Sequence, residues 1–364
     1  MTIQEITSSF EEIAPLAYAE DFDNVGLLVG DPLTEVSGVL VTLDTLENTI
    51  DEAIAKKCNL IISFHPIIFS GLKSITGKTY VERVVLRAIK NDIAIYAIHT
   101  AFDNAFNGMG KGMCDALLLN DREILIPKKK SIKKLTTYIP KNEVDTVRDA
   151  LFNAGAGNIG NYDQCSFTTT GRGSYKGNEN SNPTVGEKGE FKIGKEAQLS
   201  MTFEAHREKT ILRSLFKAHS YEEVAYEITS LENENQNIGM GMTGFLQEPM
   251  DEMAFLRFVQ KKFNAQGIRH SALRDEPINK VAVLGGSGAF AIEPAIKAGA
   301  DALITADLKY HEFYKAEGKI LLIDVGHFES EQFTKKLLTD FLRKKFSNFA
   351  IILSEEDTNP IKYL

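Results

Sequence analysis

His327 and Glu331 stand four residues apart in the segment GHFESEQF (326–333), and a run with helical character, QFTKKLLTDFLRKKF, overlaps its end. On a helix, residues i and i+4 share one face, so the imidazole and the carboxylate are expected to point into the same small volume. Imidazole and carboxylate are ligands that a divalent cation accepts together. Such pairs are also common on helix surfaces, so this one gains meaning only if other segments supply further ligands.

Two other segments carry such ligands. SFHPIIF (63–69) places His65 between an apolar run and a proline, whose ring favours an extended residue before it. IHTAFDNA (98–105) carries His99 and Asp103 four residues apart, after a second apolar run. Each has a purely structural alternative, because the histidines could be satisfied structural residues and Asp103 could cap a helix.

Taken together, His65, Asp103, His327 and Glu331 offer two imidazole nitrogens and up to four carboxylate oxygens. This set suffices for one well-held cation, or for two if a carboxylate bridges them, and zinc, iron and manganese all fit mixed nitrogen and oxygen ligands. His99, or a carboxylate of the site, is then a candidate for moving protons.

Other polar motifs have structural interpretations that we favour. The acidic segment DFDNVGLLVGDP (21–32) could lie near the site, but its aspartates are predicted to serve turns and caps. The turn GGSG (285–288) could hold an anion on its backbone amides, although the full dinucleotide-binding pattern is absent. His311 is expected on the surface or in support of the site, and His219 is expected in a structural strand-end motif.

The elements that must position these residues alternate between strand and helix patterns. In the N-terminal part, apolar, β-branched runs predict strands over 36–44, 59–64 and 93–100, with helices over 47–57 and 80–92. In the C-terminal part, strands are expected over 280–286, 301–307 and 319–325, with helices over 293–300 and 309–318. This alternation predicts α/β sheets, where ligands bind beyond the carboxyl ends of the strands. His65, His99 and His327 all fall at such ends.

The middle of the chain differs. A lysine cluster near residue 130 indicates a solvated junction. A strand over 134–140, a helix over 144–155 and a strand–helix–strand pattern within 197–229 follow, whereas the segment 155–187 is rich in Gly, Asn and Ser and is expected to form turns and loops. We therefore predict an α+β domain at 131–243, inserted between core lobes at 1–130 and 244–364.

Composition narrows the class of protein. The 364 residues are 43% hydrophobic and carry a net charge of −9, which argues against nucleic acid or an anionic membrane as the main partner but allows a small phosphorylated ligand. The three cysteines are widely spaced and form no CxxC motif, as expected for free thiols in a reducing compartment. No signal peptide or membrane span is evident, so we expect a cytoplasmic protein.

The order of DNVGLLVGDP, SFHPIIF, IHTAFD, GGSG, ITADLKYHEF and IDVGHFESE resembles the Nif-three-like family, also known as GTP cyclohydrolase 1 type 2 homologues. GAGNIGNYDQCSF and AHSYEEVAYEI in the middle segment resemble the PII-like insert of longer members. The resemblance implies two related α/β core lobes with a metal cleft between them and an inserted α+β PII-like domain. It also implies a homo-hexamer whose metal sites face an internal cavity, with the inserts capping its openings.

The resemblance further implies which residues hold metal. A first cation would take His65, Asp103 and Glu331, and a second would take His327, Glu331 and the first histidine of a His-His-Pro motif. That histidine is Phe64 here, which cannot ligate a metal. We therefore expect one firmly bound cation and a partial or labile second one.

The expected function is that of a metal-dependent hydrolase, similar to the GTP cyclohydrolases for which the family is named, acting on a nucleotide or a related small molecule. The alternative is a non-catalytic hexameric protein that senses a metal or ligand.

Overall fold

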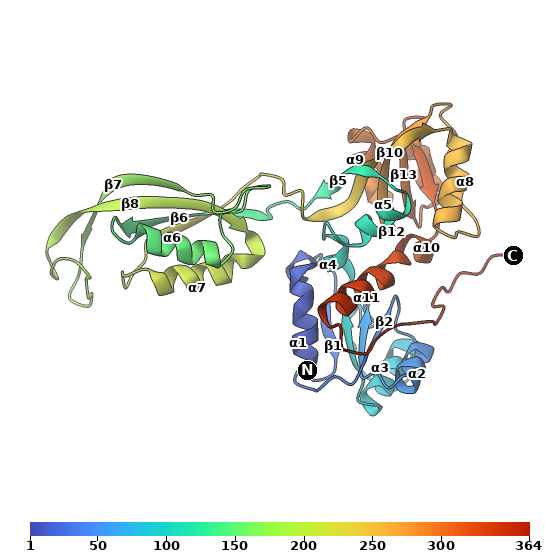
Figure 1. The fold of residues 1–364 in the computed structure, drawn as a ribbon, viewed down its shortest axis with the longest axis horizontal. Helices are drawn as coiled ribbons and strands as arrows, with labels where there is room; N and C mark the ends of the chain where they lie inside the picture. Colours follow the sequence, from blue (N-terminus) through green and yellow to red (C-terminus); the bar gives the residue numbers. More distant parts are fainter. The chain divides into compact units, whose positions relative to one another are not determined.

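The structure, a computed structural model, describes residues 1–364 and divides into two compact units (Figure 1). The core unit comprises Met1–Pro127 and Gln236–Leu364, and the inserted unit comprises Lys128–Asn235. Both mix helices with sheets, which confirms the predicted α/β class. The PII-like character of the insert and the domain limits at residues 130 and 243 stay predictions.

The first sheet of the core unit has the strand order β1-β4-β3-β2-β15. The pairs from β15 through β2 and β3 to β4 are parallel, and β1 is antiparallel to β4. The strands are β1 (Gly26–Val29), β2 (Val39–Thr42), β3 (Leu60–Ser63), β4 (Ala94–Ala97) and β15 (Ile351–Leu353).

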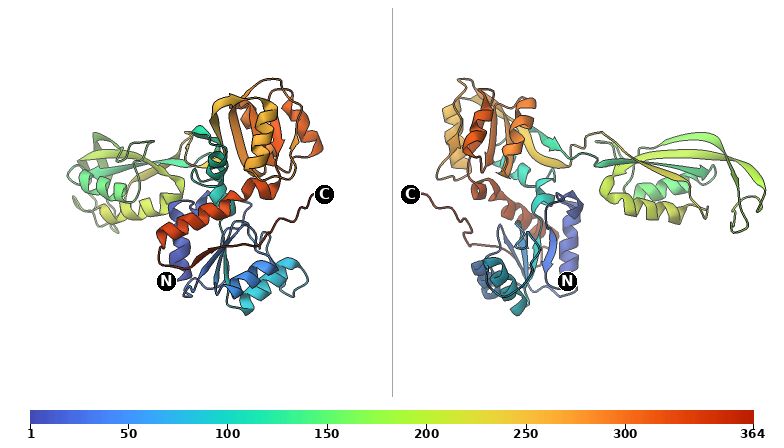
Figure 2. Two further views of the ribbon diagram at one scale, coloured as in Figure 1. Left: turned by 45° about the vertical axis from the view of Figure 1, so that its right-hand side comes forward. Right: turned by 180° about the vertical axis from the view of Figure 1, so that it is seen from behind.

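Alternating side chains of these strands pack against different helices, because successive residues of a strand point to opposite faces. Leu40 and Ile61 belong to a cluster with the helices α2 and α3, which lie side by side (Figures 1 and 2). Val41 and Ile62 instead pack in a larger cluster with α1 and α11. The helices are α1 (Ile3–Ser8), α2 (Glu47–Ala55), α3 (Tyr80–Lys90) and α11 (Phe333–Lys345).

The second sheet of the core unit has the order β11-β14-β13-β12-β10-β5. The central strands β12, β13 and β14 are parallel, and the other pairs are antiparallel. The strands are β5 (Asn120–Pro127), β10 (Gly239–Met250), β11 (Arg269–His270), β12 (Ile278–Ser287), β13 (Ala302–Ala306) and β14 (Leu321–Asp324). Helices α8 (Glu252–Lys262) and α9 (Ile292–Lys297) belong to this half of the unit.

Each sheet of the core unit contains a strand from the other end of the chain. β15, near the C-terminus, pairs with β2, and β5, from the N-terminal part, pairs with β10. The larger hydrophobic cluster includes buried residues from both sheets, among them Ile62 of β3 and Ile304 of β13. The two sheets therefore share one core, and the carboxyl ends of β3, β4 and β14 can contribute to a single site.

The inserted unit has an antiparallel sheet of order β7-β8-β6-β9, with two helices packed on one face through residues such as Leu135 and Ile211 (Figure 1). Its elements are β6 (Ile132–Pro140), α6 (Val144–Asn153), β7 (Phe167–Lys176), β8 (Phe191–Glu204), α7 (Glu208–Ala218) and β9 (Tyr226–Ser230). The segment 155–187 contains the predicted turns and loops, and it also contains the strand β7, which was not predicted. This strand is almost entirely exposed, so it lacks the buried apolar residues that mark a strand in a sequence.

Other expected helices are shorter or tighter than predicted. Residues 309–318 contain a 3₁₀ helix, η5 (Tyr310–Ala316), that ends at Glu317 in a left-handed conformation (φ 46°). No helix of the structure combines the length and the apolar character needed to cross a membrane.

Candidate metal centre

The helix α10 (His327–Glu331) begins directly after strand β14 and a turn at Gly326. Gly326 has φ 95°, and a Cβ there would lie 2.3 Å from Glu329 Oε2, so glycine alone suits this position. One helical turn brings His327 Nε2 to 3.3 Å from Glu331 Oε2. The predicted sharing of one helix face by the two residues is confirmed.

His65 reaches the same carboxylate from the first sheet. The amide of Phe64 and the amide of His65 donate to backbone oxygens of the neighbouring β2 segment, at 3.2 and 2.9 Å, which keeps the chain extended beyond the end of β3. His65 Nε2 lies 3.1 Å from Glu331 Oε2, and its ring centroid lies 5.6 Å from that of His327. The structure thus brings the ligand atoms of His65, His327 and Glu331 within 4.8 Å of one another.

Both imidazoles are oriented by a carboxylate on their other ring nitrogen. His65 Nδ1 lies 2.8 Å from Asp44 Oδ1, and His327 Nδ1 lies 2.7 Å from Asp307 Oδ2. Because these nitrogens face carboxylates, Nε2 of each ring is left to face Glu331. A carboxylate behind a histidine is the arrangement that fixes the ring of a metal-ligating histidine and raises its basicity.

The supporting carboxylates are themselves held in place. The hydroxyl of Thr358 donates to Asp44 Oδ2 at 2.7 Å, and that of Ser287 donates to Asp307. Asp307 adopts a left-handed backbone conformation with φ 56°. Asp44 and Asp307 were not among the residues predicted for the site, because neither stands in a motif with the histidine it contacts.

The charges at the centre are strongly coupled. Burial lowers the pKa of His65, but the carboxylates of Asp44 and Glu331 outweigh it and raise this pKa to about 10. For His327, burial is likewise outweighed by Asp307 and Glu331, which raise its pKa to about 10. Burial raises the pKa of Glu331, yet the two histidines lower it to about 2. Without a cation, the negative charge of Glu331 therefore favours protonation of both imidazoles.

Two buried oxygens at the centre have no hydrogen-bond partner, namely Oε2 of Glu331 and Oδ1 of Asp103. Glu331 Oε2 lies close to both imidazoles, but without the geometry of a hydrogen bond. A buried oxygen left unpaired costs about 1–3 kcal/mol, and such atoms call for an ion or another partner. The two imidazoles, the carboxylate of Glu331 that they share and the unpaired oxygen of Asp103 therefore fit a divalent cation.

Asp103 lies at the end of helix α4 (His99–Asp103) and lines the same cavity as His327 and Glu331. It is not part of the close group formed by the two histidines and Glu331. Burial, followed by the negative charge of Glu331, raises the pKa of Asp103 well above its ordinary value. Its role as a further ligand stays a prediction.

The cavity beside the centre has a volume of about 230 Å³ and includes the aromatic rings of Phe22 and Phe290 in its wall. Gly285 and Gly286 also line it, and a Cβ at Gly286 would lie 2.5 Å from Glu331 Oε1. The amide of Gly286 donates to the hydroxyl of Ser330 at 2.9 Å, so this amide does not face an anion. The GGSG turn thus permits close approach to Glu331.

His99 also lines this cavity, and a buried aspartate holds its ring. His99 Nδ1 lies 2.9 Å from Asp23 Oδ1, while Asp23 Oδ2 accepts hydrogen bonds from the amide and the hydroxyl of Thr100. Burial raises the pKa of Asp23, but His99 and Thr100 lower it to about 2. Asp23 therefore accepts a hydrogen bond from an amide in the first turn of α4. It also orients the ring of His99, and this second contact was not predicted from the sequence.

Of the other singled-out residues, Phe64 lies beside the centre, and His311 and His219 are not part of it. The fully buried Phe64 packs in the core with its ring centroid 5.0 Å from that of His65. His311 is exposed, beside Tyr310. In the inserted unit, His219 directly follows helix α7 and accepts a hydrogen bond from the amide of Tyr221 at 3.1 Å, so its role is structural but lies at a helix end and not in the predicted strand-end motif.

Comparisons with known proteins find a family and relatives that match nearly the whole chain. Residues 1–360 match the family described as Duf34/NIF3 (NGG1p interacting factor 3). A Bacillus subtilis protein named GTP cyclohydrolase 1 type 2 homolog is 40% identical over 367 residues, covering 99% of this chain and 98% of that protein. A Listeria monocytogenes protein of the same name is 34% identical, with the same two coverages. Among solved structures, a Bacillus cereus protein related to NIF3 aligns with a TM-score of 0.86 and 34% identity, covering 100% of this chain and 99% of that one.

Proposed function

The chain belongs to the Duf34/NIF3 family, and on this premise we propose that it is a metal-dependent hydrolase acting on a nucleotide or a related small molecule. The observation that carries the proposal is the convergence of His65, His327 and Glu331 from both halves of the core unit. The name GTP cyclohydrolase 1 type 2 homolog, borne by the relatives, makes GTP the first substrate to test.

In this proposal, His65, His327 and Glu331 hold the cation, and Asp103 adds a further oxygen. When bound, a divalent cation supplies Lewis acidity, which lowers the pKa of water toward neutrality. Asp44 and Asp307 keep the two imidazoles aimed at one point. Zinc, iron and manganese all accept this mixture of nitrogen and oxygen ligands.

His99 is the proposed proton-transfer residue. It lines the cavity beside the centre, and Asp23 fixes the proton on its Nδ1, so the remaining ring nitrogen can accept a proton. The rings of Phe22 and Phe290 give the cavity apolar walls, which suit the flat face of a heterocyclic substrate.

A second candidate function is favoured by Phe64, which stands where the family resemblance implies a histidine ligand of a second metal. A protein that binds one cation and a ligand without turnover would need no second metal. The homo-hexamer implied by the family resemblance is compatible with either function and forms part of both proposals.

The test combines metal content per chain with GTP turnover, measured on the purified protein and on the variant Asp103→Ala. Asp340→Ala, on the exposed face of α11, is the control for loss of a carboxylate. The hydrolase is supported if turnover requires the cation and is lost only in Asp103→Ala. One cation per chain with no turnover of GTP or other nucleotides would instead establish the binding function.

A further inference from the structure

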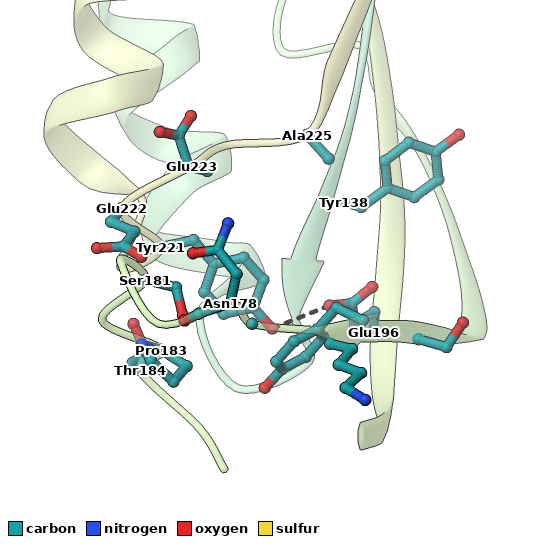
Figure 3. A pocket seen from close by; sticks show the side chains of 14 residues that line it. Tyr138, Asn178, Ser181, Pro183, Thr184, Glu196, Tyr221, Glu222, Glu223 and Ala225 are labelled. Atoms are coloured by element: carbon teal, nitrogen blue, oxygen red, sulfur yellow. Dashed lines mark hydrogen bonds between the residues drawn. The ribbon is translucent and has the colours of Figure 1, made fainter. Parts of the chain in front are cut away.

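The inserted unit contains a cavity of its own, with a volume of about 380 Å³ (Figure 3). Its walls come from β6, β8, the end of β7 with the loop that follows it, and the segment 221–225 after α7. This volume lies at the lower end of the range of small-molecule sites, which is about 300–1,000 Å³. The expected ligand is therefore small.

Three tyrosines contribute aromatic rings to the wall, namely Tyr138, Tyr175 and Tyr221. The rings of Tyr175 and Tyr221 lie 6.5 Å apart at an angle of 57°. The buried ring of His219 supports Tyr221 from behind, at 5.0 Å. Aromatic faces carry negative partial charge, so such a wall favours alkyl chains and cations.

Glu196 is the half-buried carboxylate of the cavity, and Figure 3 shows it reaching toward Tyr221. The hydroxyl of Tyr221 donates to Glu196 Oε1 at 2.9 Å. Burial, followed by Glu196, raises the pKa of Tyr221 above its ordinary value, so the hydroxyl keeps its proton. Glu196 Oε2 takes no part in this hydrogen bond, and it lies where a side chain at Gly173 would be, because a Cβ there would come within 1.9 Å.

The charge of the lining is negative. Glu222 and Glu223 are exposed members of the wall, and Lys176 is its only cationic residue. Three carboxylates against one ammonium group leave a net charge of −2. This negative charge disfavours phosphates and carboxylates as ligands. The second carboxylate oxygen of Glu196 can accept a hydrogen bond from a cationic ligand.

We propose that this cavity binds a small organic ammonium ion. The ammonium group donates hydrogen bonds to Glu196 Oε2, and the alkyl portion lies against the faces of Tyr138, Tyr175 and Tyr221. A neutral analogue would lose the charge-assisted hydrogen bond, and an anion would meet the carboxylates. The inserted unit is thereby a ligand-binding module whose chemistry is separate from that of the metal centre.

Binding is tested by titrating the full chain with hexylamine, and with hexanol and hexanoate as neutral and anionic probes of matched length, by calorimetry. We expect saturable binding of hexylamine with a dissociation constant on the order of 0.1–1 mM. Hexanol is expected to bind at least about tenfold more weakly, since it lacks the charged donor. Hexanoate is expected not to bind.

Two variants locate the site. Glu196→Gln is expected to weaken hexylamine binding by about tenfold or more, whereas Glu190→Gln, which removes the same charge outside the cavity, leaves it unchanged. Tyr138→Leu keeps an apolar wall but loses the ring face, so binding falls by about threefold. Melting curves without ligand verify that each variant is folded.

The proposal is overturned by any of three results: no saturable binding of hexylamine, equal binding of hexanol, or undiminished binding by folded Glu196→Gln. Weakened binding in Glu196→Gln together with unchanged binding in Glu190→Gln supports it.

Discussion

Nε2 of His65 lies 3.1 Å from Oε2 of Glu331, although the first residue follows a strand of the N-terminal sheet and the second ends a helix of the C-terminal half. The same oxygen lies 3.3 Å from Nε2 of His327. A ligand set that spans both sheets couples metal binding to folding, because a cation that binds only the native state stabilises it. A cation bound at the candidate centre is therefore expected to stabilise the packing of the two sheets in the core unit.

The carboxylate behind His327 should control metal affinity. In Asp307→Asn the ring of His327 loses its charged acceptor, so we expect affinity for zinc to fall by about 10–100-fold, as when other carboxylates behind ligating histidines are removed. Competition with a chromogenic chelator measures this change. Asp340→Asn, on an exposed helix, serves as the matched control, and equal affinities in the two variants would refute the role of Asp307.

The metal-free protein should show a definite dependence of stability on pH. The pKa values of His65 and His327 are raised from 6.5 to about 10, so their contribution is complete below pH 6.5 and is lost as pH rises toward 10. The pKa of Glu331 is lowered from 4.5 to about 2, so its contribution is present above pH 4.5 and is lost as pH falls toward 2.

The pH dependence is measured by urea unfolding of chelator-treated protein at a series of pH values. These groups favour greatest stability between pH 4.5 and 6.5. The gain in stability on adding zinc should increase from pH 6.5 toward 10, since the cation replaces protons on the imidazoles. A gain that shrinks over that range would contradict the proposed ligands.

Restoring the missing histidine should change the metal content. In Phe64→His, a new imidazole lies beside His65, and we expect the content to rise toward two cations per chain. Stability should fall by about 3 kcal/mol, because a fully buried aromatic ring is lost. Phe64→Leu is the matched control that loses the ring without gaining a ligand. Unchanged metal content in a folded Phe64→His protein would show that this position does not reach the centre.

The aspartate behind His99 should affect turnover without affecting the metal. In Asp23→Asn, the amide can donate to His99 Nδ1, which moves the ring proton to Nε2 and removes the proposed proton acceptor. We expect kcat for the hydrolysed nucleotide to fall by about 100-fold, with metal content and KM unchanged. Loss of metal, or an unaltered kcat, would mean that His99 has another role. Asp31→Asn, in an exposed turn, is the control.

Strands that are buried along their whole length were predictable from the sequence, because they appear as continuous apolar runs. The runs at 59–64 and 301–307 became β3 and β13, whose residues are completely buried. Two of the strands that escaped prediction lack a run of buried apolar residues, because β7 is exposed and β11 has only two residues. Their pairing is decided by neighbouring strands, which local patterns do not contain.

The candidate site shows the same division. His65, His327 and Glu331 could be singled out because each has metal-binding chemistry and stands after a predicted strand. Asp44 could not, because it meets His65 only through a tertiary contact. The segment of Asp23 was considered as a neighbour of the site, but its contact with His99 is likewise tertiary and could not be predicted. The ring-orienting carboxylates of a metal centre carry no spacing rule, so the fold is needed to find them.

The most direct test of the central claim is anomalous diffraction from crystals of the protein grown with zinc or manganese, recorded at the absorption edge of the metal. The account predicts one strong peak at about 2.0–2.2 Å from Nε2 of His65, from Nε2 of His327 and from a carboxylate oxygen of Glu331. A peak only elsewhere, or none in fully loaded crystals, would contradict it.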